Sequence, residues 1–427
     1  MADVRARYES FREARVRIRL DWLAGRSAEL DYHSVDEDHL DVTSGDALPE
    51  LRAEEAAASF AETRERHARM IAAVQAAVVA RRTRELAARA RARPDAPALR
   101  EELVARESEA LAELGFANAR AFAEALRPGV DYAWWSGQAE SFLTATAAGF
   151  RDAERALRPL AWDEVFPAAR LRPALDFALE GLSVPLARAP GLRTDESAPA
   201  RGLAFACAPR VPGEVWLVGA PRAGIPALEA IFTAAGEALH AAFTSATLPL
   251  ERRALGDPAS ALVWRFFLPQ LLAEPSFAES GPAGGRADAF AAVLRAQRLA
   301  AARRAAALVA AELALAELAP GSDPHGLETL YAERIALALG RDPDEAAFLI
   351  ECSAGLRSVD ELRALALALE LAGHLRERFG RRWWSVRAAG ELLLELWNTG
   401  TTYTPEALAL ELGVGPLGAE ALVRALL

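Results

Sequence analysis

The chain of 427 residues contains no lysine, and all 49 of its basic residues are arginine. Its 60 acidic residues outnumber them, which gives a formal net charge of −11 at pH 7. A general nucleic-acid-binding protein needs a positively charged face, and this charge balance does not provide one. The sequence therefore indicates partners other than DNA or RNA.

Cysteine is nearly absent as well, because Cys207 and Cys352 are the only 2 in the chain. Two cysteines so far apart in sequence make neither a disulfide framework nor a metal-binding knuckle. The chain also lacks any run of about 18 apolar residues, the length that a membrane-spanning helix requires. Its first segment, MADVRARYESFREARVRIRL, is charged throughout and does not resemble a secretory signal. We therefore expect a cytoplasmic protein that does not enter a membrane.

Hydrophobic residues are abundant at 52% of the chain, and many of them are alanine, which favours helices. The sequence predicts a mostly α protein, with helices that include 227–245, 258–274 and 286–319. The acidic segment DYHSVDEDHLDVTSGD, residues 31–46, is predicted to be a solvated loop. Segment 181–202 is rich in Pro, Gly and Ser and is predicted to be a linker or a long loop.

Two short segments, GLAFACAP and GEVWLVGAP, are the convincing candidates for β-strands in the sequence. They end just before a helix that contains FTAAGEALHAAF, residues 232–243. The metal helix of a zinc peptidase carries H-E-x-x-H, with two His that hold the metal and a Glu that activates water. This helix has no such motif.

Glu237 and His240 lie three residues apart, so they share one side of that helix. One interpretation is a residual metal site in which Asp257 supplies a third ligand. The other is that His240 makes a structural hydrogen bond, while Asp257 caps the helix that begins at Pro258. The sequence leaves both interpretations open.

From about residue 110 to its end, the chain resembles the oligoendopeptidase F and thimet oligopeptidase family of zinc metallopeptidases. The segments that carry the resemblance are LAELGFANARAFAEAL, AFACAPRVPGEVWLVGAP, LPLERRALGDPASALVWRFFLPQLL and the tail LRERFGRRWWSVRAAGELLLELWNTGTTYTPEALALELGVGPL. The resemblance implies a two-lobed, gluzincin-like helical body around a channel, with one small sheet beside the former metal helix. It also implies an N-terminal helical region, 1–195, and a catalytic-like region, 196–427. The strand GEVWLVGAP is expected to be an edge strand that can accept an extended peptide.

The resemblance implies that the positions of the family's zinc ligands and catalytic Glu carry different side chains in this sequence. The first zinc-binding His falls on Thr233, the catalytic Glu on Ala234, and the second His on Glu237. The third ligand, a Glu on the following helix, falls on Leu262. Catalytic zinc needs three protein ligands and an open position, and neither Thr nor Leu can replace imidazole or carboxylate.

A late segment of the family carries tyrosines that stabilise the transition state. The corresponding segment here is LRSVDELRAL, which places Arg357 and Glu361 at the tyrosine positions. We therefore expect a chain without zinc or another cofactor that has lost peptidase activity and binds a peptide or protein. An intact paralogue, to which this chain serves as a regulatory subunit, is one such partner. The alternative is an active metallo-oligopeptidase or another hydrolase that holds zinc through displaced ligands.

Overall fold

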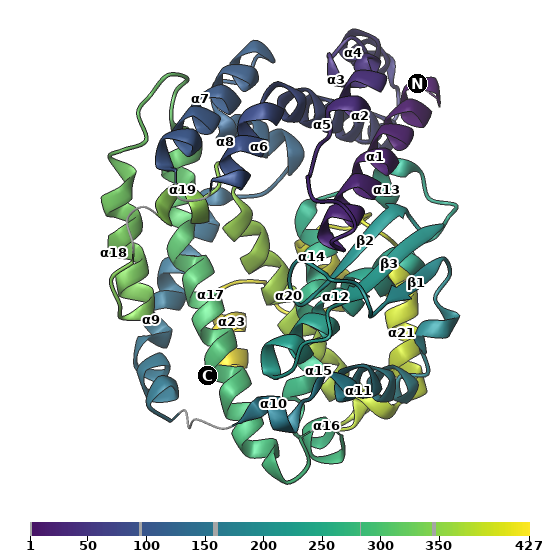
Figure 1. Ribbon diagram of the computed structural model, residues 1–427, viewed down its shortest axis with the longest axis vertical. Coiled ribbons are helices and arrows are strands. Elements are labelled where there is room, and N and C mark those ends of the chain that lie inside the picture. The colour runs from purple at the N-terminus through teal and green to yellow at the C-terminus, as the bar shows by residue number, and fades with distance from the viewer. Residues whose placement is uncertain (1, 94–95, 157–160, 282, 344–346) are drawn as a thin grey trace. The chain divides into compact units, whose positions relative to one another are not determined.

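The computed structural model describes residues 2–93, 96–156, 161–281, 283–343 and 347–427. These residues are mostly helical and include one three-stranded sheet (Figure 1), so the prediction of a mostly α fold with one small sheet is confirmed. Every helix in these ranges is too short or too polar to cross a lipid bilayer.

The chain forms two compact units, each assembled from separate segments. Unit 1 comprises Met1–Ile18, Leu30–Leu143 and Ala302–Glu361, and unit 2 comprises Arg19–Glu29, Thr144–Ala301 and Leu362–Leu427. Four helices contribute residues to both units: α1 (Ala2–Leu23), α9 (Tyr132–Ala156), α17 (Ala287–Glu317) and α20 (Arg357–Phe379). The predicted regions 1–195 and 196–427 are contiguous in sequence, whereas each unit combines separate segments. The division into these two regions therefore stays a prediction.

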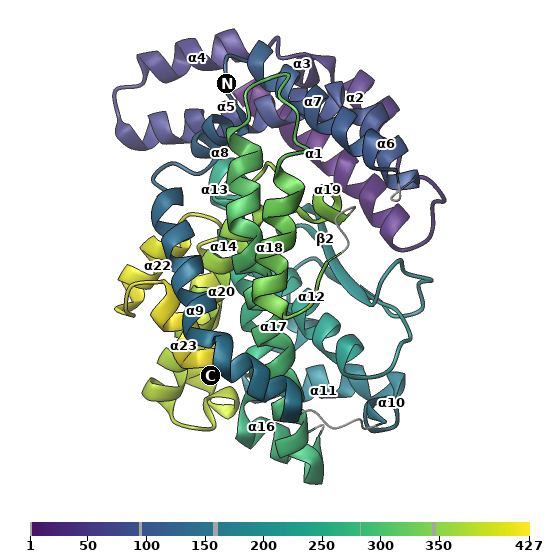
Figure 2. The same cartoon turned by 90° about the vertical axis from the view of Figure 1, so that its left-hand side faces the viewer.

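Unit 1 is built from helices. Besides its parts of the four shared helices, it contains α2 (His33–Asp38), α3 (Leu40–Thr43), α4 (Leu48–Ala57), α5 (Ala61–Arg82), α6 (Arg84–Ala92), α7 (Pro97–Glu113), α8 (Ala119–Leu126), α18 (Leu327–Leu339) and α19 (Phe348–Glu351). Figure 2 shows α4 and α5 as neighbours, and the two helices pack together. The guanidinium of Arg303 in α17 is buried and donates to the carbonyls of Leu337 and Ala338 at 3.2 and 2.8 Å. These bonds satisfy backbone acceptors at the C-terminal end of α18.

The acidic segment 31–46 is not the solvated loop that its composition predicts. It contains α2 and α3, and the Asp36 side chain within it is fully buried. Arg15 and Arg84 both lie 3.3 Å from the Asp36 carboxylate, so two guanidinium groups compensate its burial. The prediction was wrong because these arginines come from distant helices, and a local acidic run does not reveal them.

Unit 2 contains the sheet and the helices that surround it. Its elements, besides the shared helices, are α10 (Trp162–Val165), α11 (Ala168–Gly181), η1 (Leu186–Arg188), β1 (Leu192–Asp195), β2 (Ala204–Arg210), β3 (Glu214–Gly219), α12 (Ile225–Phe243), α13 (Leu250–Arg253), α14 (Pro258–Phe267), α15 (Gln270–Ala273), α16 (Pro275–Ser280), η2 (Gly284–Arg286), η4 (Trp383–Ser385), α21 (Arg387–Asn398), α22 (Pro405–Leu412) and α23 (Ala419–Leu426). Helix α12 packs against β2 and β3, as predicted for the helix that follows the sheet.

The strand order corrects two expectations from the sequence. The order is β1-β3-β2, with β1 parallel and β2 antiparallel to β3 (Figure 1). Strand β3, which was expected to be an edge strand, is therefore central and cannot accept a peptide. Strand β1 lies within the segment 181–202 that was predicted to be a linker, and its pairing partner is 23 residues away in the register Leu192 to Val215. The edges of the sheet are β1 and β2.

Helix α12 is the most deeply buried helix around the sheet, and Gly236 sets its distance from α14. A Cβ atom at Gly236 would lie 2.0 Å from the carbonyl oxygen of Trp264, which is far inside van der Waals contact. Only glycine therefore allows this close approach of the two helices. The core beside them contains Trp264, Trp383 and Trp397, each at most 2% exposed.

Candidate functional site

One side of α12 remains partly open to solvent. Thr233 and Glu237 are half-buried there and lie four residues apart, so they share that side of the helix. Ala234 is 1% exposed and belongs to the packed side. The resemblance assigns zinc binding or catalysis to three positions of α12. Thr233 and Glu237 therefore lie on its open side, and Ala234 lies on its packed side.

An arginine from α14 faces Glu237. Nη1 of Arg265 lies 3.6 Å from Oε1 of Glu237, and both side chains are partly exposed at 41% and 31%. Arg265 is therefore at ion-pair distance from Glu237. Leu262 is half-buried and precedes Arg265 by three residues, so it lies on the same side of α14.

The edge strand β2 packs against α12, the helix that carries Glu237. Burial raises the pKa of the Cys207 thiol in β2 to about 11; Arg19 opposes this rise, and the carboxylate of Glu237 adds to it. The raised pKa makes Cys207 a poor nucleophile, because the thiolate is the reactive form.

His240 is buried beneath the open side of α12. Its Nε2 donates to the carbonyl oxygen of Gly400 at 3.1 Å, and its ring stacks on Trp264 with 5.7 Å between centroids. Burial lowers the pKa of His240 to about 4, although the bond to Gly400 opposes this shift. His240 is therefore a neutral hydrogen-bond donor in the core at pH 7.

The depressed pKa of His240 predicts a loss of stability in acid. In the unfolded chain His240 titrates near 6.5, so the unfolded state binds more protons below that pH and folding weakens as pH falls toward 4. A shift of this size corresponds to about 3 kcal/mol between pH 7 and pH 4. We expect His240→Gln, which keeps a donor for Gly400, to remove that part of the pH dependence of the melting temperature.

The matched control for this experiment is His325→Gln, since His325 is an exposed histidine of unit 1. This control should leave the acid destabilisation nearly unchanged. Equal acid sensitivity in wild type and His240→Gln would show that His240 is not the group that titrates.

Asp257 lies at the start of α14, and its carboxylate accepts two sets of hydrogen bonds. Its Oδ1 accepts the backbone N–H of Ala259 at 2.9 Å, as expected for an N-cap. Its carboxylate also accepts two hydrogen bonds from Arg363, at 3.0 and 2.6 Å. Glu237, His240 and Asp257, the three residues of the proposed residual metal site, therefore each contact a different partner.

Arg357 and Glu361 belong to unit 1 and pair with each other. Nε of Arg357 donates to Oε1 of Glu361 at 2.9 Å on the first turn of α20. Arg357 is largely exposed, so this pair adds little stability. The assignment of both residues to former transition-state positions stays a prediction, as do the assignments of Thr233, Ala234, Glu237 and Leu262.

Sequence reasoning did not single out Arg363 or the position of Cys207 beside Glu237. Arg363 is completely buried and binds both Asp257 and Glu406, which come from sequence segments before and after it. Nothing in the local sequence around Arg363 distinguishes it from the other arginines of an arginine-rich chain. Its role follows only from the tertiary structure.

Comparison with known proteins identifies the fold through structure alone. No protein-family model and no curated protein sequence matches this chain. A carboxypeptidase from Pyrococcus furiosus is similar over 100% of this chain and 97% of its own, with a TM-score of 0.73 and 12% identity. Trypanosoma cruzi metallocarboxypeptidase 1 is similar over 99% and 96%, with a TM-score of 0.70 and 13% identity. A Bacillus anthracis protein assigned to oligoendopeptidase F is similar over 89% and 68%, with a TM-score of 0.58 and 12% identity.

These structures show that the chain has the fold of helical zinc peptidases. The similarity extends over nearly the whole length of the two carboxypeptidases. At 12–13% identity the similarity establishes the fold and not the activity.

Zinc is the group that this fold implies, and the side chains assigned to its site do not fit it. Of Thr233, Glu237 and Leu262, only Glu237 has a donor that zinc accepts, and Arg265 faces that carboxylate. In the described parts of the chain, no three His, Cys, Asp or Glu side chains are grouped so that they could hold a metal ion. We therefore derive no catalytic step through a metal.

Proposed function

We propose that this chain is a catalytically inactive protein with the zinc-peptidase fold, which binds an extended peptide along the outer edge of β2 at Ala204–Cys207. The observation that carries the proposal is the Glu237–Arg265 pair, which places a guanidinium against a predicted metal position. A cation there disfavours Zn²⁺ by direct repulsion. The backbone of an edge strand is independent of metal ligands, so peptide binding can persist after catalysis is lost.

The open side of α12 would form the second wall of this peptide site. Thr233 and Glu237 lie on it, and α12 packs against β2. Backbone groups of the peptide would pair with β2, while its side chains would meet Thr233 and the Glu237–Arg265 pair. A segment of a partner protein, such as an intact paralogue, would use the same contacts.

The proposal predicts that metal-free protein binds peptides through their backbone. A panel of fluorescently labelled octapeptides is titrated with protein in the presence of a chelator, and binding is followed by anisotropy. N-methylation of alternate residues in the best ligand should weaken it by about tenfold or more, because each lost N–H bond removes roughly 1 kcal/mol. Thr233→Trp should have a similar effect, because the indole would fill the space beside α12.

The control is Thr247→Trp, which introduces the same side chain at an exposed position beyond the end of α12. It should bind the octapeptide like the wild type. Binding that survives both N-methylation and Thr233→Trp would place the peptide elsewhere, and cleavage of the octapeptides after zinc is added would favour the active hydrolase.

A further inference from the structure

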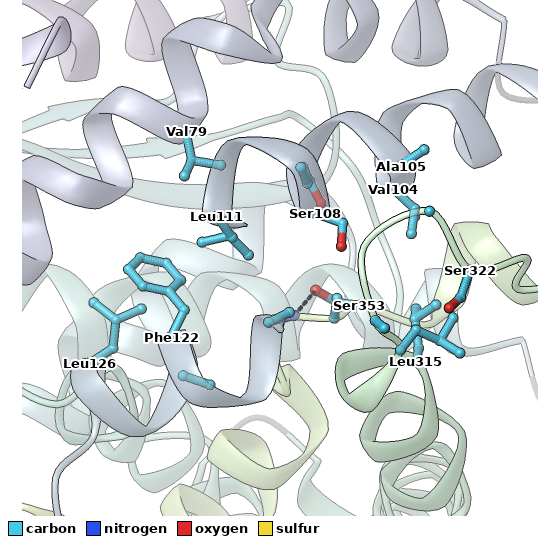
Figure 3. A pocket seen from close by; sticks show the side chains of 18 of the residues that line it. Val79, Val104, Ala105, Ser108, Leu111, Phe122, Leu126, Leu315, Ser322 and Ser353 are labelled. Atoms are coloured by element: carbon cyan, nitrogen blue, oxygen red, sulfur yellow. Dashed lines mark hydrogen bonds between the residues drawn. The ribbon is translucent and has the colours of Figure 1, made fainter. Parts of the chain in front are cut away.

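Unit 1 contains a cavity whose lining includes none of the residues of the proposed peptide site. Its volume is about 260 Å³, and it is bordered by α7, α8, the end of α17 and the segments around 321 and 354. Figure 3 shows Leu111, Phe122 and Leu126 on one side and Leu315 on another. At ~30 Å³ for each water-sized group, the space corresponds to roughly nine non-hydrogen atoms. The cavity thus fits a small, largely apolar molecule.

One carboxyl group borders this cavity without a compensating charge. Glu107 of α7 has no hydrogen-bond or ion-pair partner among the residues that the structure describes. Burial raises the pKa of its carboxyl to about 7. A carboxyl without a partner is costly to bury in its charged form, and a cationic ligand would remove that cost.

The other charged side chain of the cavity wall is already neutralised. Arg127 donates to the carboxylate of Asp360 at 2.5–2.9 Å and to the carbonyl oxygen of Gly355 at 2.9 Å. The Arg127–Asp360 pair is buried and carries no net charge. The charge of the cavity wall is therefore set by Glu107.

A second hollow borders Glu107 and is lined by Arg15, Arg84, Arg91 and Tyr32. Arg15 and Arg84 pair with Asp36, as described above. Among the described residues, none of these three arginines is at ion-pair distance from Glu107. The arginine-lined hollow therefore does not supply the missing cation.

Two hydroxyl groups add acceptors to the cavity wall. Figure 3 shows Ser108 between the apolar side chains and Ser322 near Leu315. Neither hydroxyl has a hydrogen-bond partner in the described part of the chain. These hydroxyls can accept hydrogen bonds from the N–H donors of a protonated amine.

We propose that this cavity binds a small primary amine with an apolar body, whose ammonium group pairs with Glu107 and whose body packs between Phe122, Leu111 and Leu315. The site lies wholly within unit 1, and the proposal is independent of the peptide site in unit 2. The N-terminal amine of a peptide has the same ammonium chemistry. The size of the cavity favours the free amine.

The test uses 2-phenylethylamine as the probe and isothermal titration calorimetry of the full chain as the measurement. The probe stays protonated between pH 6 and 8, whereas the ionised fraction of Glu107 rises about tenfold over that range for a pKa of about 7. Affinity should therefore rise up to about tenfold from pH 6 to pH 8, with release of a proton on binding. The neutral analogue 2-phenylethanol should bind at least about tenfold more weakly at pH 8.

Two variants locate the site. Glu107→Gln should weaken binding of the amine at pH 8 by about tenfold or more and remove its pH dependence. Glu109→Gln, on the exposed side of α7 where Glu109 pairs with Arg106, should bind as the wild type does. Melting temperatures of both variants check that they are folded.

Several results would overturn the proposal: no binding of 2-phenylethylamine, equal binding of 2-phenylethanol, or unchanged binding in Glu107→Gln. A tripeptide that begins with phenylalanine distinguishes the two sources of the ammonium group. If it binds more tightly than the amine, and does so through Glu107, the site is one for peptide N-termini and the assignment to a small amine is wrong.

Discussion

Replacing Arg363 with methionine is expected to reduce the free energy of unfolding by about 3–5 kcal/mol, the cost of breaking a buried ion pair on one side. Arg363 is fully buried and donates to both carboxylate oxygens of Asp257 and both of Glu406, at distances of 2.6–3.0 Å. Methionine fills much of the same volume but leaves the two carboxylates without their cation. Denaturant unfolding of unit 2, followed by tryptophan fluorescence, measures the loss.

The matched control is Arg387→Met. Arg387 pairs with Glu391 on the surface of α21, and both side chains are mostly exposed, so the loss should stay below about 1 kcal/mol. Adding Asp257→Asn and Glu406→Gln to Arg363→Met should restore part of the stability, because the unpaired charges are then removed. A loss for Arg363→Met no larger than that of the control would show that this cluster does not hold the start of α14 in place.

The second large effect concerns zinc. A variant with Thr233→His, Glu237→His and Leu262→Glu restores the predicted ligands, yet we expect it to bind no stoichiometric zinc while Arg265 remains. Two unit charges 4 Å apart interact by about 4 kcal/mol at an effective dielectric constant of 20. The solvent exposure of Arg265 reduces this figure, but the double charge of Zn²⁺ increases it. Adding Arg265→Ala should then allow zinc to bind.

The control for the zinc variant is Arg295→Ala in place of Arg265→Ala. Arg295 is an exposed arginine of α17 in unit 2. Removing it should leave the triple variant without zinc, since Arg265 still faces position 237. Zinc in the triple variant with Arg265 intact, measured by atomic emission after gel filtration, would contradict the account and show that the site needs only its ligands.

Ala234→Glu is left out of the zinc variant for a structural reason. Ala234 is 1% exposed on the packed side of α12, so a glutamate there would have to displace its neighbours. The closed surroundings of Ala234 would hinder a catalytic glutamate at this position.

The sequence predicted the features of the structure that depend on residues close together in the chain. The helical character and the order of two strands before α12 follow from propensity and pattern, and both are present. The central position of β3 was not predictable, because it depends on β1, a four-residue strand hidden in a segment rich in Pro and Gly. The same holds for Asp36, whose burial depends on arginines from two other helices.

The candidate site shows a similar division. Chemistry indicates that a buried Glu237 needs a cation, but only the structure shows that Arg265 lies at ion-pair distance from it. The sequence could not show that Cys207 lies near Glu237, or that Glu107 borders a cavity. These facts depend on distances between segments far apart in the chain, and one sequence contains no signal for them.

On the proposed function, the chain no longer uses zinc to cleave peptides. The most direct test is metal analysis of the purified wild-type protein, before and after incubation with zinc, together with mass spectrometry of the octapeptide panel. We predict substoichiometric zinc in both samples and no cleavage of any peptide. Stoichiometric zinc that a chelator removes, along with peptide cleavage that is lost with the metal, would contradict the claim and identify an active metallopeptidase with displaced ligands.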